Sequence, residues 1–374
     1  MKKLAAALLL AIGTAASAAE TGVGANKVAI GMSVPLTGPL AGYGVQLRRG
    51  LALGLEQVNA AGGIGGREIE LVVKDDAGRP EQSVANTQAL LDAGVLAMTG
   101  FHGAGAVEAV LPLLDAAGVP VVGVASSAEL LREPPRRNLF NLRAGAREEA
   151  AAMVLHLDTV GLTELAVLAQ DDALGRAGLD GIQVELTRLA MRPQAVVRLA
   201  ADASAAAIAG AVQQACRGQP QGLMLVLDAR NALAAIRVAR RAACGARFYV
   251  TSEAGAQLLA SGAEAGELAG VIVSQVVPHP TSAAIPLQVE FQRASAAAGV
   301  APSYPTFEGF IYARALAEAL RRCGRELTRR CLVANLESKP LDLGGYRLQF
   351  TPNDRRGSRF VEMTIVTADG RFRR

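Results

Sequence analysis

The sequence predicts an α/β fold with two doubly wound parallel-sheet lobes joined by a multi-crossing hinge. Three observations predict it: short apolar runs alternate with longer amphipathic runs, the alternating series occurs twice, and proline-rich segments interrupt it. Continuously apolar strands are typical of sheets that helices cover on both faces. The chain of 374 residues also exceeds the roughly 250–300 residues that one hydrophobic core usually organises, so we expect two domains.

Each series reads as strands that alternate with helices. In the first, strands are expected at 28–34, 69–75, 95–100 and 119–124, and helices at 45–59, 82–93 and 106–117. In the second, strands are expected at 164–171, 195–200, 222–228 and 247–251, and helices at 148–159, 177–189, 203–216 and 231–243. This alternation predicts crossover connections and parallel pairing.

Two segments with several prolines predict the places where the chain crosses between the lobes. Pro134 and Pro135 precede an extended segment at 138–143, and three prolines lie in 271–286. Helices at 286–298 and 306–323 and a β-rich tail follow, and an Asp-Gly turn in the tail predicts a hairpin. We expect 26–143 and 279–340 to form lobe 1, and 144–278 and 341–374 to form lobe 2.

The N-terminus reads as a cleavable signal peptide at 1–19. Lys2 and Lys3 precede an apolar run that ends at Ile12, and small residues at 16–18 predict cleavage near Ala18 and Ala19. No cysteine stands directly after the cleavage region, so no lipid anchor is expected. We expect a free protein in the periplasm.

Four cysteines in an exported chain permit disulfides, because the periplasm is oxidising. Four cysteines allow three pairings. Cys216 and Cys244 each lie near the end of a helix-like run, and Cys323 and Cys331 bracket the short segment GRELTRR. We therefore favour Cys216 with Cys244 and Cys323 with Cys331, and free buried thiols are the alternative.

The composition argues against several classes of function. Basic residues are scattered, and the net charge of +4 comes without the dense stripe that nucleic acid or a membrane surface would need. The three histidines lack metal-site spacing, and neither a nucleophile elbow nor a phosphate-binding loop occurs. We therefore expect no metal, no cofactor, no nucleic-acid partner and no enzymatic activity.

Candidate ligand-binding residues follow the predicted strands, where ligands of open parallel sheets bind. They are Tyr43, His102 in the segment 100–106, Ala125, Ser126 and Ser127 in the first lobe, and Asp171, Asp172, Arg230 and Glu253 in the second. Hydroxyls and backbone amides of one lobe can bind a carboxylate, and acids of the other an ammonium. The alternatives are loop packing for Tyr43, a structural hydrogen bond for His102, a helix cap for Asp171 and Asp172, and surface charge for Arg230 and Glu253.

Several motifs in order resemble the type I periplasmic solute-binding proteins, specifically the leucine/isoleucine/valine-binding family of ABC importers. They are PLTGPLAGYG at 35–44, VNAAGGIGGREIELVVKDDAGRPEQS at 58–83, LPLLDAAGVPVVG at 111–123, AVLAQDDALGRAG at 166–178 and EGFIYARALAEAL at 308–320. The resemblance covers nearly the whole chain after the leader.

The resemblance implies roles for individual residues. Tyr43 corresponds to an aromatic cleft wall, Ala125 and Ser127 to contacts with the ligand's α-carboxylate and ammonium, and Glu253 to the acid that neutralises the ammonium. Three positions depart from the family's pattern. Ala104 replaces a frequent serine or threonine, and Leu174 replaces a tyrosine. Arg230 or Ala229 falls where another tyrosine is common in the family, and an arginine there could pair a second ligand carboxylate.

The function implied by the resemblance is a monomeric binding component that presents a small solute to an ABC permease. The expected solute carries a carboxylate, as an aliphatic or branched-chain amino acid does. A ligand sensor with the same fold, or a binder of an aromatic carboxylate or an amide, is the alternative. An exported enzyme that uses Asp171, Asp172 or Glu253 is disfavoured, because no nucleophile accompanies these acids.

Overall fold

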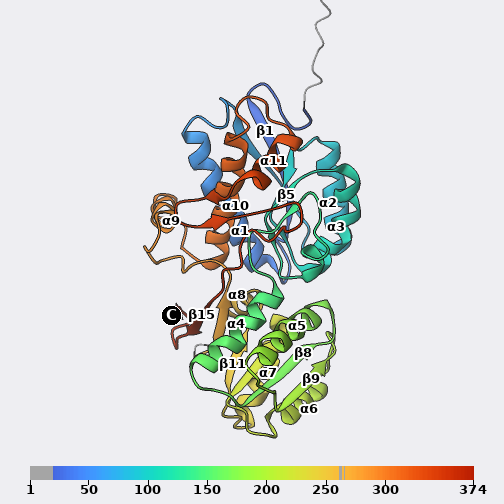
Figure 1. Cartoon of the computed structure of the whole chain (residues 1–374), viewed down its shortest axis with the longest axis vertical. Helices are drawn as coiled ribbons and strands as arrows, with labels where there is room; N and C mark the ends of the chain where they lie inside the picture. Colours follow the sequence, from blue (N-terminus) through green and yellow to red (C-terminus); the bar gives the residue numbers. More distant parts are fainter. Residues whose placement is uncertain (1–19, 261–262, 265) are drawn as a thin grey trace, which may run out of the picture.

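The computed structural model describes residues 20–260, 263–264 and 266–374. The expected signal peptide at 1–19 therefore lies outside the described residues. Figure 1 shows two lobes, one around β1 and α1 and the other around β8 and β11. Within the described part of the chain, none of the helices is long and apolar enough to cross a membrane. The predicted two-lobed α/β fold is confirmed.

Lobe 1 contains a five-stranded sheet in the order β2-β1-β3-β5-β7, and all its neighbouring strands are parallel. The strands are β1 (Lys27–Val34), β2 (Glu68–Asp75), β3 (Ala97–Met98), β5 (Val121–Val122) and β7 (Leu139–Phe140). A separate parallel pair, β4 (Phe101–His102) and β6 (Val124–Ala125), follows β3 and β5 along the chain. His102 is therefore the last residue of β4, and Ser127 lies in the loop that follows β6.

Helices cover both faces of this sheet, as continuously apolar strands require. One hydrophobic cluster joins β1 to α1 (Ala41–Ala60), α9 (Pro286–Ala297), α10 (Tyr304–Arg321) and α11 (Arg329–Ser338). The cluster on the other face contains residues of α2 (Pro80–Asp92) and α3 (Ala104–Ala117). A short 3-10 helix, η1 (Glu129–Leu131), follows β6.

Glycine lets α1 and α10 approach closely. A Cβ atom built on Gly50 would lie 1.7 Å from the Thr306 carbonyl oxygen, and one built on Gly309 would lie 2.1 Å from the Leu47 carbonyl oxygen. No larger residue fits either position without moving a helix. The close packing fixes Tyr43 on α1 beside Glu308 on α10.

Lobe 2 contains a seven-stranded sheet in the order β16-β15-β12-β11-β10-β8-β9. The strands are β8 (Leu165–Gln170), β9 (Ala195–Leu199), β10 (Gly222–Val226), β11 (Arg247–Val250), β12 (Ile272–Gln275), β15 (Glu362–Val366) and β16 (Phe372–Arg373). Pairs that involve β15 are antiparallel and the others are parallel. The predicted hairpin is confirmed, because β15 and β16 flank the Asp369-Gly370 turn.

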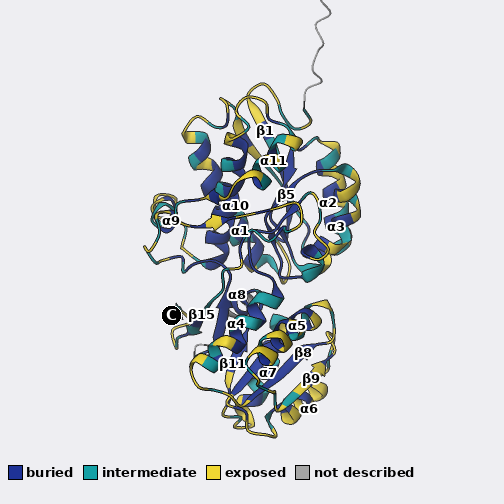
Figure 2. Ribbon diagram, viewed as in Figure 1, coloured by how far each residue is buried: buried dark blue, intermediate teal, exposed yellow. Residues whose placement is uncertain are grey.

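Two hydrophobic clusters cover the two faces of the second sheet. Residues of α4 (Ala146–Thr159) and α5 (Ala173–Arg188) pack on one face. Residues of α6 (Ala205–Cys216), α7 (Ala229–Arg241) and α8 (Ser252–Ala260) pack on the other. Figure 2 shows the central strands of both sheets buried, while exposed residues lie mainly on the helices and loops around them. The edge strands β2 and β9 are only partly buried.

The tail divides between the lobes, which corrects the expected assignment of 341–374 to lobe 2. The hairpin of β13 (Leu341–Asp342) and β14 (Arg347–Leu348) belongs to the hydrophobic core that contains α1 and α10. Phe350 packs in the same core, and the chain enters the lobe 2 sheet only at β15. The tail alternates apolar and polar residues in both halves, and such alternation predicts burial without identifying the core that receives the side chains.

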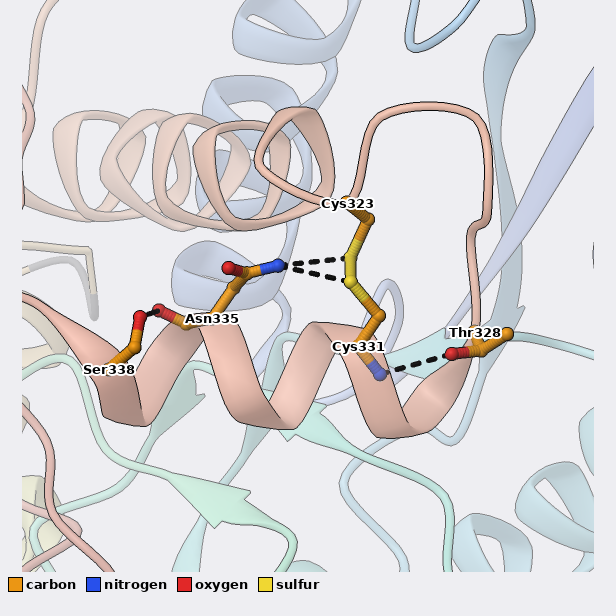
Figure 3. Close-up of a disulfide and its surroundings, with 5 residues drawn as sticks. All are labelled: Cys323, Thr328, Cys331, Asn335 and Ser338. Carbon is orange, nitrogen blue, oxygen red and sulfur yellow. Dashed lines mark hydrogen bonds between the residues drawn. A yellow bond between two sulfur atoms is a disulfide. The ribbon is translucent and has the colours of Figure 1, made fainter.

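Both predicted disulfides are confirmed. Cys216 pairs with Cys244 at a Cα–Cα distance of 5.9 Å, and Cys323 pairs with Cys331 at 5.8 Å. The first joins the end of α6 to the segment after α7, as expected for neighbouring helices. The second ties the segment after α10 to α11, and the Asn335 side-chain amide donates to both of its sulfur atoms (Figure 3).

Candidate functional site

Tyr43 and His102 lie together in lobe 1. Their rings stack, with centroids 4.3 Å apart and planes inclined by 6°. The His102 Nδ1–H donates to the Ala125 carbonyl oxygen at 2.8 Å. The structure thus brings three predicted site residues together, and it gives His102 the structural hydrogen bond that the sequence left open.

The Tyr43 hydroxyl points into a buried polar network. It donates a short hydrogen bond to Glu308, and it accepts one from Arg143 Nη1 at 3.1 Å. Glu308 also accepts from the hydroxyl of Tyr312, one turn along α10. Burial, together with the Glu308 carboxylate, raises the pKa of Tyr43 well above its usual value. The hydroxyl therefore remains a hydrogen-bond donor at neutral pH.

Arg143, in the first crossing, is the centre of this network. Its side chain is fully buried, and its guanidinium lies 3.4 Å from Glu149, 3.4 Å from Glu308 and 3.9 Å from Glu253. Burial acts to lower the pKa of Arg143, but the surrounding carboxylates, Glu308 foremost, outweigh it and raise that pKa. The guanidinium stays charged and connects α10 in lobe 1 with α4 and α8 in lobe 2.

Glu149 completes the lobe 2 side of the network. Its carboxylate accepts hydrogen bonds from the backbone N–H of Ser252 at 2.7 Å and from the Ser274 hydroxyl at 2.6 Å. Burial raises the pKa of Glu149, although Arg143 and these hydrogen bonds oppose the rise. These contacts fix the start of α8, a helix that was not expected from the sequence.

Sequence reasoning missed Arg143, Glu149 and Glu308 as site residues. A signal for Glu308 was present, because this charged residue stands between Phe307 and Phe310 on a helix most of whose residues are buried, Glu308 included. A charged residue in such surroundings requires an opposite charge or several hydrogen bonds. Its partner Arg143 lies 165 positions earlier, which no local pattern reveals.

Ser127 and Glu253 meet across the lobes. The Ser127 backbone N–H, in the loop after β6, donates a short hydrogen bond to Glu253, in the first turn of α8. The Glu253 side chain is 18% exposed. Ser126 is fully buried, and its hydroxyl accepts from the Ala128 N–H at 3.3 Å. Ser126 therefore orders its own loop, whereas Ser127 offers its N–H to the opposite lobe.

The other candidates of lobe 2 lie at helix starts. Asp172 caps α5, accepting from the Gly175 N–H at 3.1 Å and the Gln170 amide at 2.6 Å. Leu174 packs against the core of α4 and α5. Asp171 is exposed and pairs with Arg198 at 3.3 Å. Asp172 thus has the helix-cap role that the sequence offered as the alternative.

Ala104 and Arg230 have different environments. Ala104 is the first residue of α3 and packs against the core of α2 and α3. Arg230, in the first turn of α7, is exposed, and its guanidinium donates to the Ala201 carbonyl oxygen. In the described part of the chain Arg230 has no carboxylate within ion-pair distance.

Two cavities between the lobes share Tyr43. The larger, ≈ 710 Å³, is lined by Gly38, Pro39, Leu40, Gly42 and Tyr43 of lobe 1 and by Asp228, Ala229, Arg230, Leu233, Ala234 and Arg237 of lobe 2. The other, ≈ 550 Å³, has Gln46, Ser303 and Tyr304 of lobe 1 and Ala256, Arg371 and Phe372 of lobe 2 among its lining residues. Cavities of this size accommodate small organic solutes. Of the predicted site residues, Tyr43 and Arg230 line them.

The site offers hydrogen-bond donors, carboxylates and aromatic rings. The described residues contain no group of three histidine, cysteine or acidic side chains that could hold a metal ion. The four cysteines are all in disulfides. The arrangement is suited to binding a polar solute by hydrogen bonds and charge.

Comparison with known proteins identifies the family. The family described as periplasmic binding protein matches residues 27–371. The Leu/Ile/Val-binding protein homolog 3 of Brucella melitensis is 27% identical over 182 residues, which are 48% of this chain and 50% of that protein. The matched region thus spans about half the length of this curated relative.

Solved structures extend the likeness to the whole fold. An extracellular ligand-binding receptor from Verminephrobacter eiseniae is 30% identical with a TM-score of 0.83, covering 93% of this chain and all of the other. A solute-binding protein from Rhodopseudomonas palustris, in complex with 3,4-dihydroxybenzoic acid, has a TM-score of 0.74 at 19% identity, covering 92% and 95%. The relatives and the shared fold are those of binding proteins rather than enzymes. The chain therefore belongs to the periplasmic binding protein family, as a type I member related to the Leu/Ile/Val-binding proteins.

Proposed function

We propose that this protein binds a small carboxylate-bearing solute, an amino acid, between its lobes in the periplasm and presents it to an ABC permease. The observation that carries the proposal is the meeting of the Ser127 N–H of lobe 1 with the Glu253 carboxylate of lobe 2. A backbone N–H is a donor for a ligand carboxylate, and Glu253 is an acceptor for a ligand ammonium.

Aromatic groups and the adjoining cavities supply the remaining contacts. Tyr43 lines both interlobe cavities, so its ring can pack against an apolar ligand side chain. The chain crosses between the lobes at more than one place, which favours a hinge with one open and one closed arrangement. A ligand that contacts both lobes stabilises the closed arrangement.

A thermal-shift screen of ligand-stripped protein tests the proposal. The panel contains the amino acids, aromatic carboxylates such as 3,4-dihydroxybenzoate, and small amides. A ligand at 100 times its Kd adds about 2.7 kcal/mol of stability, and small-angle scattering should then show a smaller radius of gyration. Shifts with aromatic acids or amides alone would contradict the amino-acid assignment, and a ligand that binds without compaction would contradict closure.

Two substitutions of Tyr43 separate its ring from its hydroxyl. Tyr43→Ala should weaken binding by roughly 1–3 kcal/mol, because it removes apolar contact area from the cleft wall. Tyr43→Phe keeps the ring and removes only the hydrogen bonds to Glu308 and Arg143, so it should lower stability more than affinity. Calorimetric titration and urea unfolding measure the two effects. Equal affinity of Tyr43→Ala and the unsubstituted protein would limit Tyr43 to packing.

A further inference from the structure

We propose that the β15–β16 hairpin is a strap between the two lobes, and that Phe372 sets how tightly solutes bind by holding the lobes closed. This role is independent of the identity of the solute, so it goes beyond the proposed function. Three features support it: an anchor in lobe 2, an aromatic contact with lobe 1, and a hydrogen bond to the second crossing, which is the segment 276–285 between β12 and α9.

The hairpin is anchored in the sheet of lobe 2. β15 pairs with β12 in antiparallel register over residues 362–365, and the buried Thr364 hydroxyl donates to the Val273 carbonyl oxygen at 3.1 Å. After the turn, β16 returns along β15 and places Phe372 opposite Val366. Figure 1 shows β15 beside the junction of the two lobes. The position of Phe372 is therefore fixed by lobe 2.

The Phe372 side chain reaches the core of lobe 1. It is partly buried, and it packs both against the lobe 1 core that contains α1 and α10 and against the lobe 2 core that contains α6 and α7. Its ring meets the ring of Tyr304, at the start of α10, with centroids 5.3 Å apart and planes inclined by 81°. Aromatic pairs in this edge-to-face geometry attract each other beyond the burial of apolar area. An aromatic contact thus joins a strand of lobe 2 to a helix of lobe 1.

Phe372 is also bonded to the second crossing. His279 Nδ1 accepts from the Thr281 N–H at 3.3 Å, so Nε2 carries the proton and donates to the Phe372 carbonyl oxygen at 3.3 Å. The His279 ring lies edge-on to Tyr304, with centroids 5.6 Å apart. The rings of His279, Tyr304 and Phe372 therefore form one group, to which the crossing, lobe 1 and lobe 2 each contribute one member.

The strap closes the smaller of the two interlobe cavities. His279, Tyr304 and Phe372 all line the cavity of ≈ 550 Å³, together with Tyr43. The cavity of ≈ 710 Å³ differs, because within the described ranges no hydrogen bond or ion pair joins its lobe 1 lining residues to its lobe 2 lining residues. The contacts of Phe372 therefore oppose separation of the lobes at the smaller cavity.

Holding the lobes closed affects affinity in a characteristic way. A ligand that binds only the closed arrangement has an apparent Kd equal to its intrinsic Kd divided by the fraction of protein that is closed. Weakening the strap lowers that fraction, so it should raise the Kd of every such solute by the same factor. A residue that contacts the solute changes Kd by a factor that depends on the solute.

Small-angle scattering of the ligand-free protein tests the strap. Phe372→Ala should have a larger radius of gyration than the unsubstituted protein. Phe360→Ala is the matched control, since Phe360 is also partly buried and packs against the lobe 1 core, while the lobe 2 clusters of described residues do not include it. Tyr304→Leu removes the other ring of the pair, so it should also open the protein, and combining it with Phe372→Ala should open the protein no further.

Calorimetric titrations with leucine and with valine measure the effect on binding. Phe372→Ala should raise both Kd values by the same factor, roughly threefold to tenfold, as expected for the loss of one aromatic pair. An unchanged radius for Phe372→Ala, an equal increase for Phe360→Ala or additive increases from the two rings overturns the proposal, and so do unequal factors for the two amino acids. Failure of the proposed function looks different: neither amino acid binds the unsubstituted protein, while Phe372→Ala still has the larger radius.

Discussion

The wall that lobe 1 contributes to the cleft is buried and internally bonded, whereas the wall of lobe 2 consists of residues in the first turns of helices. Tyr43, His102 and Ser127 are 5%, 1% and 1% exposed, and stacking and hydrogen bonds hold the first two in place. Arg230 and Glu253 start α7 and α8 and are more exposed.

The difference shows where the site is rigid and where it can change. A substitution in the lobe 1 wall disturbs packing and buried hydrogen bonds, so it costs stability. A substitution at the start of a lobe 2 helix changes the charge and length of a more exposed side chain, so it disturbs less packing. We expect ligand binding to begin on lobe 1 and ligand selectivity to be set mainly by lobe 2.

The largest effect is expected from removing the Arg143 guanidinium, which joins the two walls. Arg143→Met keeps much of the side-chain volume but leaves Glu149 and Glu308 buried without their cation. Removing one partner of a buried ion pair costs about 3–5 kcal/mol. Urea unfolding at neutral pH measures the loss.

The control and the rescue keep the result interpretable. Arg188→Met removes an arginine that is 54% exposed and pairs with Glu185, so its cost should stay within about 1 kcal/mol. If Arg143→Met does not fold, adding Glu149→Gln and Glu308→Gln should restore folding by removing the unpaired charges. A loss below 1 kcal/mol for Arg143→Met would mean that the two walls are not coupled through this residue.

The disulfides give a comparison of whole lobes. Cys216–Cys244 in lobe 2 closes a separation of 28 residues, and Cys323–Cys331 in lobe 1 closes one of 8. Loop-closure entropy assigns about 3.6 kcal/mol to the first and about 2.5 kcal/mol to the second. Replacing both cysteines of a pair by serine should therefore lower stability more in lobe 2. Equal losses in denaturant unfolding would show that entropy of the unfolded chain is not the main effect.

Much of the fold was predictable because it depends on local periodicity. The helix expected at 82–93 is α2 (Pro80–Asp92), and the one expected at 148–159 is α4 (Ala146–Thr159). The short helices α8 and α11 have only 9 and 10 residues, too few to show a clear period, and they were not predicted. The hairpin of β13 and β14 was assigned to the wrong lobe, because alternation does not identify the core.

The candidate site was less predictable, since its charged contacts join distant parts of the chain. Tyr43 and Glu253 could be proposed from their places after strands and from resemblance. The direction of the Tyr43 hydroxyl could not be predicted from the sequence, because its hydrogen-bond partner Glu308 lies 265 positions away. The contact between Glu253 and Ser127 could not be predicted either, because these residues are 126 positions apart and belong to different lobes.

The smallest predicted effect concerns the loop before Tyr43, and it depends on pH. Asp75, at the end of β2, accepts from the Leu36 N–H at 2.8 Å and the Thr37 hydroxyl at 2.7 Å. Burial acts to raise the pKa of Asp75, but the hydrogen bonds from Thr37, Leu36 and Ala77 outweigh it and lower that pKa from 3.8 to about 2. A carboxyl group whose pKa is lower in the folded state stabilises the protein when the pH is above its pKa in the unfolded state. This contribution is lost as the pH falls through its pKa in the folded state.

Asp75→Asn should therefore lower stability by about 1–2 kcal/mol at pH 7, because hydrogen bonds to a charged acceptor are lost. The difference from the unsubstituted protein should shrink as the pH falls from 3.8 to about 2. Asp158→Asn is the control, since among the described residues the Asp158 carboxylate has neither a hydrogen bond nor an ion pair. Urea unfolding over this pH range measures the difference in stability between the Asp75 variant and the unsubstituted protein. If that difference is unchanged at about pH 2, the effect of Asp75 comes from its shape rather than its charge. The lobe 1 wall would then be fixed by packing.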